Sequence, residues 1–262
     1  MTPQPSPGTS SSTPCFDVAR LAGLVANAVW RGSELGAVKE EVVKTGFAAL
    51  DAELPGGGWP VRSLIELLQP QPSVCEWRLL GNSLRCVVEG GGELLLVSPP
   101  LAPHLPGLEQ YGLRAAQLVW LDARLPAERL WATEQLIKAN PKGAILAWLP
   151  QARSEQLRRL QVCAQSCQAL IFLLRPAAAQ FDASPAPLRV LASAGEDWRL
   201  RVQVLKRRGP MHSQPLSLRS IPESLAGVLR PHQLRPTPLH ISLDASHGAL
   251  AGPAREPQFT SH

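Results

Sequence analysis

The fold is decided by residues 45–68, TGFAALDAELPGGGWPVRSLIELL. The apolar spacing within residues 46–53 predicts a short helix, with Thr45 as its N-terminal cap. The three glycines at 56–58 then allow backbone conformations that residues with a Cβ avoid. The apolar run at 63–68 predicts a buried strand. We therefore expect a helix, a glycine hinge and a core strand, in that order.

The chain after this stretch alternates apolar runs with amphipathic segments. Further strands are predicted at residues 93–98, 117–121, 144–149 and 169–174, and helices at 76–88, 125–139 and 153–168. This alternation is typical of an α/β fold, in which helices cover both faces of a mainly parallel sheet. Two later runs, 188–193 and 198–206, have no helix between them. The second alternates apolar residues with Arg or Gln, which predicts an antiparallel extension with one buried and one solvent-exposed face.

Composition divides the chain into four parts. Residues 1–14 are almost entirely Pro, Ser, Thr and Gly, and are expected to be disordered because they can bury little apolar surface. Residues 15–44 are expected to form a helix, over 16–30, followed by a polar linker. Residues 45–209 form the predicted core domain, and the proline-rich residues 210–262 a loosely ordered tail.

Charge, cysteine usage and hydropathy narrow the class of protein. The 26 basic and 21 acidic residues give a net charge of +5, which permits an anionic partner without requiring one. The five cysteines lack the spacing of a disulfide scaffold, which predicts reduced thiols and a cytoplasmic protein. Cys163 and Cys167 lie one helical turn apart and are expected to pack in the core rather than bind a metal. No signal-peptide pattern and no apolar run near ~20 residues is present, so no membrane contact is expected.

The loop after the first core strand is where a phosphate-binding loop, GxxxxGK[ST], would be expected. In this chain the position is occupied by Gln69, Pro70, Gln71, Pro72, Ser73, Val74, Cys75 and Glu76. Both glycines are missing, Cys75 stands at the lysine position, and Glu76 stands at the hydroxyl position, where its charge would repel phosphate. Trp148 stands where an Asp would hold the Mg²⁺ shell. The sequence therefore predicts no catalytic residue, no metal site and no cofactor.

Several short motifs, taken together, resemble a known family. They are TGFAALDAELPGGGWP at 45–60, the strand ending Glu66-Leu67-Leu68, LWATEQ at 130–135, RRLQ at 158–161, SPAPLR at 184–189 and LKRRG at 205–209. The first, with the strand that follows it, resembles the segment that leads into the phosphate loop of RecA-type recombinases. As a set, spanning about residues 16–209, the motifs resemble the ImuA family, RecA-like proteins associated with translesion DNA synthesis and loosely grouped with the cell-division inhibitor SulA.

This resemblance implies a RecA-like core and a non-catalytic accessory role in bacterial damage-induced mutagenesis, within the SOS response. It also implies an ImuB-type polymerase-like protein and an error-prone replicative polymerase as partners, with RecA as a further candidate that the helix at 16–30 would contact. The departure at residues 69–76 argues against ATP hydrolysis. Two alternatives stay open: a SulA-like inhibitor that binds the division GTPase, and an ATPase with an unusual phosphate loop.

Seven basic side chains are candidates for binding DNA or a partner: Arg158, Arg159, Arg199, Arg201, Lys206, Arg207 and Arg208. The last five lie within ten residues that contain no acid, and the first two lie on a helix expected nearby. Such side chains neutralise phosphates without reading base sequence, so single-stranded DNA is a candidate partner. The alternative is a solvated strand face. Trp59, on the glycine hinge, is either an exposed anchor for a partner or a ring folded over the sheet, whereas Trp120 and Trp148 are expected in the core.

Overall fold

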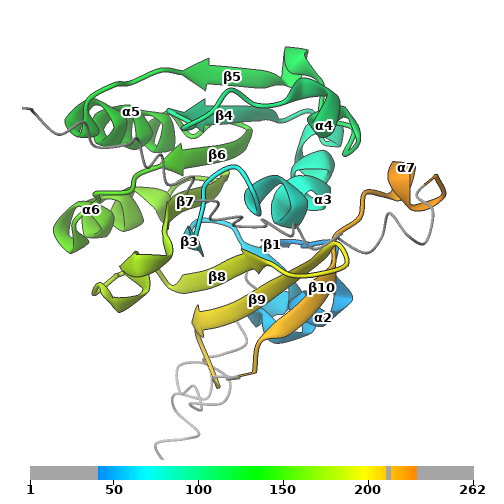
Figure 1. The fold of residues 1–262 in the computed structure, drawn as a ribbon. Helices are drawn as coiled ribbons and strands as arrows, with labels where there is room; N and C mark the ends of the chain where they lie inside the picture. Colours follow the sequence, from blue (N-terminus) through cyan, green and yellow to red (C-terminus); the bar gives the residue numbers. More distant parts are fainter. Residues whose placement is uncertain (1–40, 211–213, 229–262) are drawn as a thin grey trace, which may run out of the picture.

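The computed structural model describes residues 41–210 and 214–228 (Figure 1). The predictions for the tail at 1–14, for the helix at 16–30 and for residues 229–262 lie outside the described residues. No helix in the described ranges combines the length and the apolar character that a membrane span requires.

The centre of the molecule is an eight-stranded sheet with the order β10-β9-β8-β3-β7-β6-β4-β5. Its strands are β3 (Leu64–Gln69), β4 (Glu93–Val97), β5 (Leu118–Leu121), β6 (Gly143–Trp148), β7 (Leu170–Pro176), β8 (Leu188–Ala194), β9 (Arg199–Lys206) and β10 (Leu216–Arg219). From β8 to β5 every neighbouring pair is parallel, whereas β9 and β10 are added in antiparallel pairs. A second, two-stranded antiparallel sheet joins β1 (Val42–Val43) to β2 (Trp59–Pro60). The predicted α/β fold with an antiparallel extension is confirmed.

Helices cover both faces of the large sheet (Figure 1). Successive strand residues point to opposite faces, so the apolar side chains of a buried strand need a covering layer on each side. The helices are α2 (Ala48–Glu53), α3 (Glu76–Glu89), α4 (Leu105–Glu109), α5 (Pro126–Ala139), α6 (Ser154–Ala164) and α7 (Glu223–Ala226), with short 3-10 helices η2 (Pro55–Gly57), η3 (Ala115–Gln117) and η4 (Ala177–Phe181). On β3, Ile65 belongs to the core cluster that includes α3, and Leu64 to the one that includes α5 and α6. The predicted strands and helices of this parallel part are present, most within two residues of the expected bounds.

The stretch that leads into the sheet differs from its prediction at the helix start. Helix α2 begins at Ala48 because Gly46 has φ +85°, which is outside the helical region. The Thr45 hydroxyl accepts the Phe47 N–H at 3.0 Å, so Thr45 stabilises the turn before the helix rather than capping it. At the hinge, a Cβ on Gly58 would lie 2.5 Å from the Val43 carbonyl oxygen. The hinge glycine thus permits β1 to lie close against β2.

Two predictions about the sheet edges were wrong. The sequence predicts a loosely ordered tail at residues 216–219, but they form β10, in which Leu218 is buried and pairs with Leu200 of β9. Trp120 is predicted in the core, but it is 47% exposed, because β5 is an edge strand with a neighbouring strand on one side only. Trp148, on the more central strand β6, is buried as predicted.

Candidate functional site

The candidate site is the loop between β3 and α3, residues 70–75, at the edge where the parallel strands end. We call this the carboxyl edge; it also includes the ends of β4, β6 and β7. Strand β3 has β7 on one side and β8 on the other, while the chain after α3 continues to β4, beyond β6 and β7. Parallel α/β sheets bind ligands at this edge, where strand order reverses. The loop therefore lies where the sequence predicts it, between the first core strand and the helix that follows.

The loop is filled by a carboxylate of the protein itself. Glu76, the first residue of α3, is fully buried, and its Oε1 accepts the Ser73 N–H at 2.6 Å. Ser73 has φ +65°, in the left-handed region that non-glycine residues rarely adopt. Burial raises the pKa of Glu76 above its usual range, while the N–H groups of Ser73, Cys75 and Glu76 act in the opposite direction. An acid thus occupies the helix N-terminus where a phosphate would bind in a nucleotide site.

The other groups of the loop provide few of the contacts that would hold an anion. Burial raises the pKa of Cys75 to about 11, so the thiol at the lysine position is neutral at physiological pH. Pro70 and Pro72 have no N–H to donate, and they are exposed together with Gln71 and Val74. The loop therefore lacks both the cation and several of the amide donors that hold phosphates.

An apolar slot of about 130 Å³ lies beside this loop. Its walls include Pro70, Pro72 and Pro176, with Gln69 and Trp148 among the lining residues. Trp148 ends β6 at the expected Mg²⁺ position, and its ring lies 6.4 Å from that of Trp77. The Trp148 Nε1 and both polar atoms of the Gln69 amide are buried without a hydrogen-bond partner. The Gln69 amide also acts to lower the pKa of Glu76, although the two side chains form no hydrogen bond of standard geometry.

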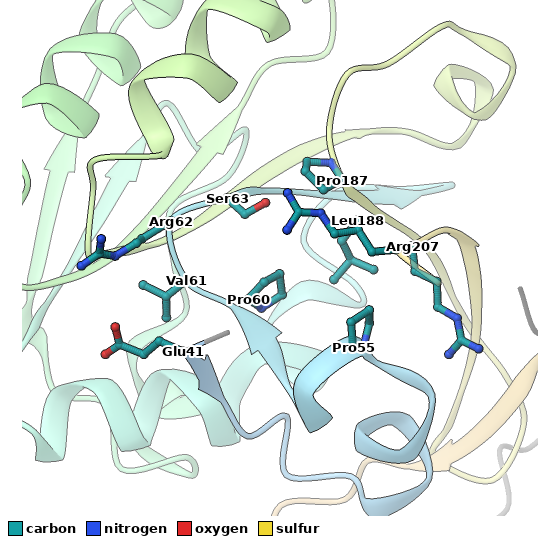
Figure 2. Close-up of a pocket in the computed structure, with 10 residues that line it drawn as sticks. Glu41, Pro55, Pro60, Val61, Arg62, Ser63, Pro187, Leu188 and Arg207 are labelled. Carbon is teal, nitrogen blue, oxygen red and sulfur yellow. The ribbon is translucent and has the colours of Figure 1, made fainter. Parts of the chain in front are cut away.

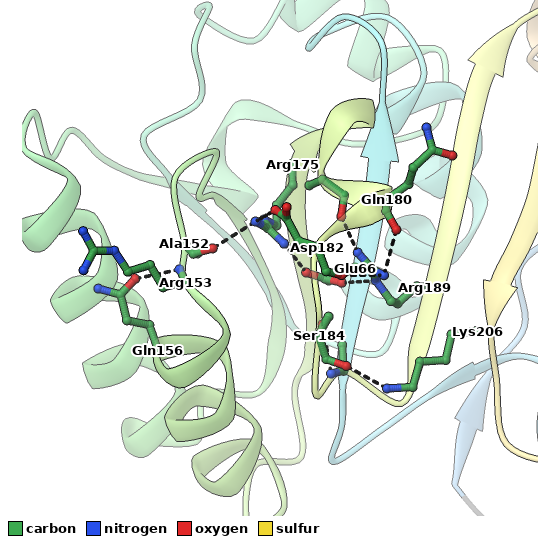
Figure 3. Close-up of polar contacts among 12 residues, drawn as sticks. Glu66, Ala152, Arg153, Gln156, Arg175, Gln180, Asp182, Ser184, Arg189 and Lys206 are labelled. Carbon is green, nitrogen blue, oxygen red and sulfur yellow. Dashed lines mark hydrogen bonds and ion pairs between the residues drawn. The ribbon is translucent and has the colours of Figure 1, made fainter.

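A buried ionic cluster joins the three central strands behind the loop (Figure 3). Glu66 of β3 is fully buried and binds Arg175 of β7 at 2.8 Å and Arg189 of β8 at 2.5 Å. Arg175 also binds the Asp182 carboxylate at 3.1 Å, and Arg189 donates to the carbonyls of η4, including Ala179 at 2.6 Å. Sequence reasoning missed this cluster because its members come from three strands that are distant in the chain.

The predicted basic residues do not form one cluster. Arg199 and Arg201 are exposed at the start of β9, on the face opposite its buried residues, as the alternation predicted. The structure adds Arg219 of β10, which lies directly opposite Arg199 in the antiparallel register. Like charges in this position repel. We call Arg199, Arg201 and Arg219 the arginine strip; none of the three forms an ion pair with a described residue.

The other end of β9 lies at the opposite, amino edge of the sheet. Lys206 donates to the Ser184 carbonyl at 2.8 Å, and Arg207 is paired with Glu53 at 3.1 Å, with 14% of its side chain exposed. Arg207 and the exposed Arg208 line a cavity of about 380 Å³ that also includes Ser63 (Figure 2). Lys206 and Arg207 are therefore engaged within the fold, which leaves them less available to bind DNA than the sequence suggested.

The two α6 arginines are also separate from the strip. Helix α6 packs against α5 and β3, whereas β8 lies between β3 and β9 (Figure 1). Arg159 is paired with Glu134 of α5 at 2.6 Å, while Arg158 is exposed. The expectation that this helix would lie beside the β9 arginines is wrong, because α6 covers the part of the sheet next to β3.

Trp59 is not an exposed anchor. Its side chain is 1% exposed, its Nε1 donates to the Ser83 hydroxyl at 3.0 Å, and its ring packs edge-on against Phe172. The ring thus folds over the sheet, which is the second of the two expected arrangements. Cys163 and Cys167 are free thiols, and the described residues contain no group of three His, Cys, Asp or Glu side chains that could hold a metal.

One contact of the site carries a recognisable sequence signal. Ser73 and Glu76 have the S-x-x-E spacing of a capping box, and Glu76 binds the Ser73 N–H, but the helix itself begins at Glu76 with Cys75 as its N-cap. No comparable pattern marks Arg219, because its position opposite Arg199 depends on the register of β10. A scan of the chain against protein-family models and a search of curated proteins both find no match.

Proposed function

We propose that this protein is a non-catalytic, RecA-like accessory factor in bacterial damage-induced translesion DNA synthesis. It acts through protein contacts and through DNA contacts of the arginine strip. The observation that supports a non-catalytic role is the buried Glu76 carboxylate, which binds the Ser73 N–H in the position that a nucleotide phosphate would need. Phosphoryl transfer depends on cationic clamps and metal at this position, and a carboxylate beside a neutral Cys75 thiol supplies neither.

The motifs behind the family resemblance contact one another in space, which supports the assignment. The contacts are Glu134 with Arg159, Gln161 with the Leu64 N–H, Arg189 with Glu66, and Lys206 with the Ser184 carbonyl. Each contact joins two of the quoted motifs, or joins a motif to the strand β3 that follows the first of them. Residues that bind each other depend on each other for stability. The joint occurrence of the motifs is therefore better explained by one shared core than by several independent chance matches.

Co-purification from DNA-damaged bacterial cells tests the role. The tagged protein should recover a polymerase-like protein together with an error-prone replicative polymerase. Recovery of the division GTPase instead, with cell filamentation on overexpression, would favour a SulA-like inhibitor. Hydrolysis of ATP by the purified protein that changes in a Glu76→Ala variant would place an ATPase at this loop and refute the non-catalytic assignment.

The DNA contact has its own test. Arg199, Arg201 and Arg219 replaced together by Ala should weaken binding to single-stranded DNA. Three lost phosphate contacts should also reduce the slope of log K against log salt by about 2. Arg158→Ala is the matched control, since Arg158 is exposed on a different element. Because the strip residues are exposed, the triple variant should keep the wild-type circular dichroism spectrum. An unchanged affinity and slope would remove DNA binding from the proposal and leave the protein contacts.

A further inference from the structure

A separate cavity opens at the carboxyl edge between the first turns of α5 and α6. Its volume is about 590 Å³, within the range of about 300–1,000 Å³ that is common for small-molecule sites. Its charged lining residues are Arg124, Arg129 and Arg153, and no Asp or Glu is among the described residues that line it. We call it the arginine pocket. A concave surface with three cations and no acid in its lining favours an anion.

The arginines of this pocket have donors available. Arg129 is half-buried, and its Nε donates to the Ala123 carbonyl at 2.9 Å, which orients the guanidinium and leaves its terminal nitrogens for a ligand. Arg124 and Arg153 are exposed, and their guanidinium groups make no hydrogen bond or ion pair with any residue of the described ranges. A fixed guanidinium beside two free ones suits an oxyanion, because the planar fork of donors matches phosphate geometry.

Two helices begin at the pocket and add to its positive potential. Pro126 and Ala127 of the 14-residue α5 and Gln156 of the 11-residue α6 are among the lining residues. The first N–H groups of a helix have no partner within it and carry partial positive charge. The nearby acid of α5, Glu128, accepts the Leu125 N–H at 3.2 Å and is outside the lining. Glu155 of α6 is also outside the lining.

The apolar slot beside the β3–α3 loop adjoins this pocket, since Arg129 and Pro150 line both. Trp148 lines the slot and is 5% exposed, yet its Nε1 has no hydrogen-bond partner. A buried donor without a partner is costly, and a bound acceptor would satisfy it. Proline rings and the Trp148 indole make flat apolar walls of the kind against which a planar base can lie.

We propose that the arginine pocket binds a terminal phosphate group, a phosphomonoester, whose attached base lies in the slot at Trp148. The two negative charges of the monoester match the three arginines, and no metal is needed to neutralise them. The same group occurs on a free nucleoside monophosphate and on the 5′-phosphorylated end of a DNA strand. The site does not depend on the accessory role or on the arginine strip, because the cavity and its own residues carry it.

Calorimetric titration of the full-length protein with dAMP, in EDTA, tests the site. A double variant, Arg124→Ala with Arg153→Ala, should weaken binding at least about tenfold, as the loss of charge-assisted hydrogen bonds predicts. Arg114→Ala is the control and should change affinity by less than about twofold, because Arg114 is exposed and outside the lining. The proposal would be overturned if the double variant and the control variant weakened dAMP binding equally. It would also be overturned if the protein bound neither dAMP nor a 5′-phosphorylated oligonucleotide.

Further probes separate the two sources of the phosphate. A short oligonucleotide with a 5′-phosphate is compared with the same strand carrying a 5′-hydroxyl. If the phosphorylated strand binds more tightly than dAMP, and the double variant loses that binding, the site recognises the end of a strand. If dAMP binds more tightly than the phosphorylated strand, the site recognises a free nucleotide. Equal binding of the two strands, with equal sensitivity to the double variant, would overturn the phosphomonoester assignment. Trp148→Phe should weaken dAMP binding but leave that of inorganic phosphate unchanged. These measurements use purified protein, so they fail independently of the co-purification.

Discussion

Glu66→Gln should destabilise the fold far more than removal of a comparable charge near the surface. Glu66 is fully buried, and its two oxygens bind two different guanidinium groups, Arg175 at 2.8 Å and Arg189 at 2.5 Å. A glutamine of the same shape has one acceptor oxygen, and its NH₂ group would point a donor at the other guanidinium. One buried cation would thus face a donor instead of a charge.

The size of the effect follows from burial. The side chains of Arg175 and Arg189 are 2% and 8% exposed, so water cannot replace the lost carboxylate. Breaking a buried ion pair from one side costs about 3–5 kcal/mol, because the remaining charge stays buried without compensation. For a domain of this size each kcal/mol lowers Tm by about 2–4 °C, so the variant should melt about 6–20 °C lower.

The assay is thermal and urea unfolding, with Glu134→Gln as the matched control. Glu134 also binds two cations, but those of Lys138 and Arg159 are 51% and 66% exposed, so water replaces much of what is lost. The control should lower Tm by no more than about 4 °C. Equal losses in the two variants, at an unchanged urea m-value, would refute the view that the Glu66 cluster holds β3, β7 and β8 together.

Three further predictions concern the hinge and the loop. Gly58→Ala should lower the free energy of unfolding in urea, because the new Cβ would lie 2.5 Å from the Val43 carbonyl oxygen. Trp59→Phe should cost about 1–3 kcal/mol in the same assay, because it leaves the buried Ser83 hydroxyl without the Nε1 donor. Glu76→Gln should flatten the pH dependence of stability. Burial raises the pKa of Glu76 in the folded state above that of an unfolded glutamate, which is about 4.3. The wild-type protein is therefore most stable, as far as this group is concerned, at pH values below about 4.3. It loses that stability as the pH rises through the raised pKa of the folded state. The variant should match the wild type in stability at acid pH and exceed it at pH 8; a difference that does not grow with pH would contradict this.

The parallel part of the fold could be predicted from sequence because each central strand carries apolar residues on both faces. Strand β3, for example, is buried at all six residues, which a short apolar run between a glycine hinge and a helix indicates directly. Strand β10 could not be predicted in the same way. Its four residues owe their structure to pairing with β9, and only Leu218 among them is buried. The exposure of Trp120 likewise depends on β5 lying at the sheet edge, which local periodicity does not encode.

The candidate site was predictable only as far as its residues are neighbours in the chain. The β3–α3 loop and its missing lysine are contiguous, so the sequence located them, and the Ser73–Glu76 spacing contained the signal for their contact. The Glu66 cluster joins three strands, and the arginine pocket joins two helices and the segments before them. Both depend on strand order, which brings together residues that are far apart in the sequence.

The two halves of the carboxyl edge, the β3–α3 loop and the arginine pocket, differ in the groups that they present to an anion. Beside β3 the helix N-terminus is already occupied by the buried Glu76 side chain, which binds the Ser73 N–H, so an incoming phosphate would meet an acid and not a free donor. At α5 and α6 the helix N-termini adjoin three arginines that no lining acid neutralises. Because Coulomb interactions act over several ångströms in a partly buried crevice, we expect an anion that reaches this edge to favour the arginine pocket over the β3–α3 loop. If the arginine pocket binds phosphate as proposed, anions are recognised at this edge beside α5 and α6 and not at the β3–α3 loop.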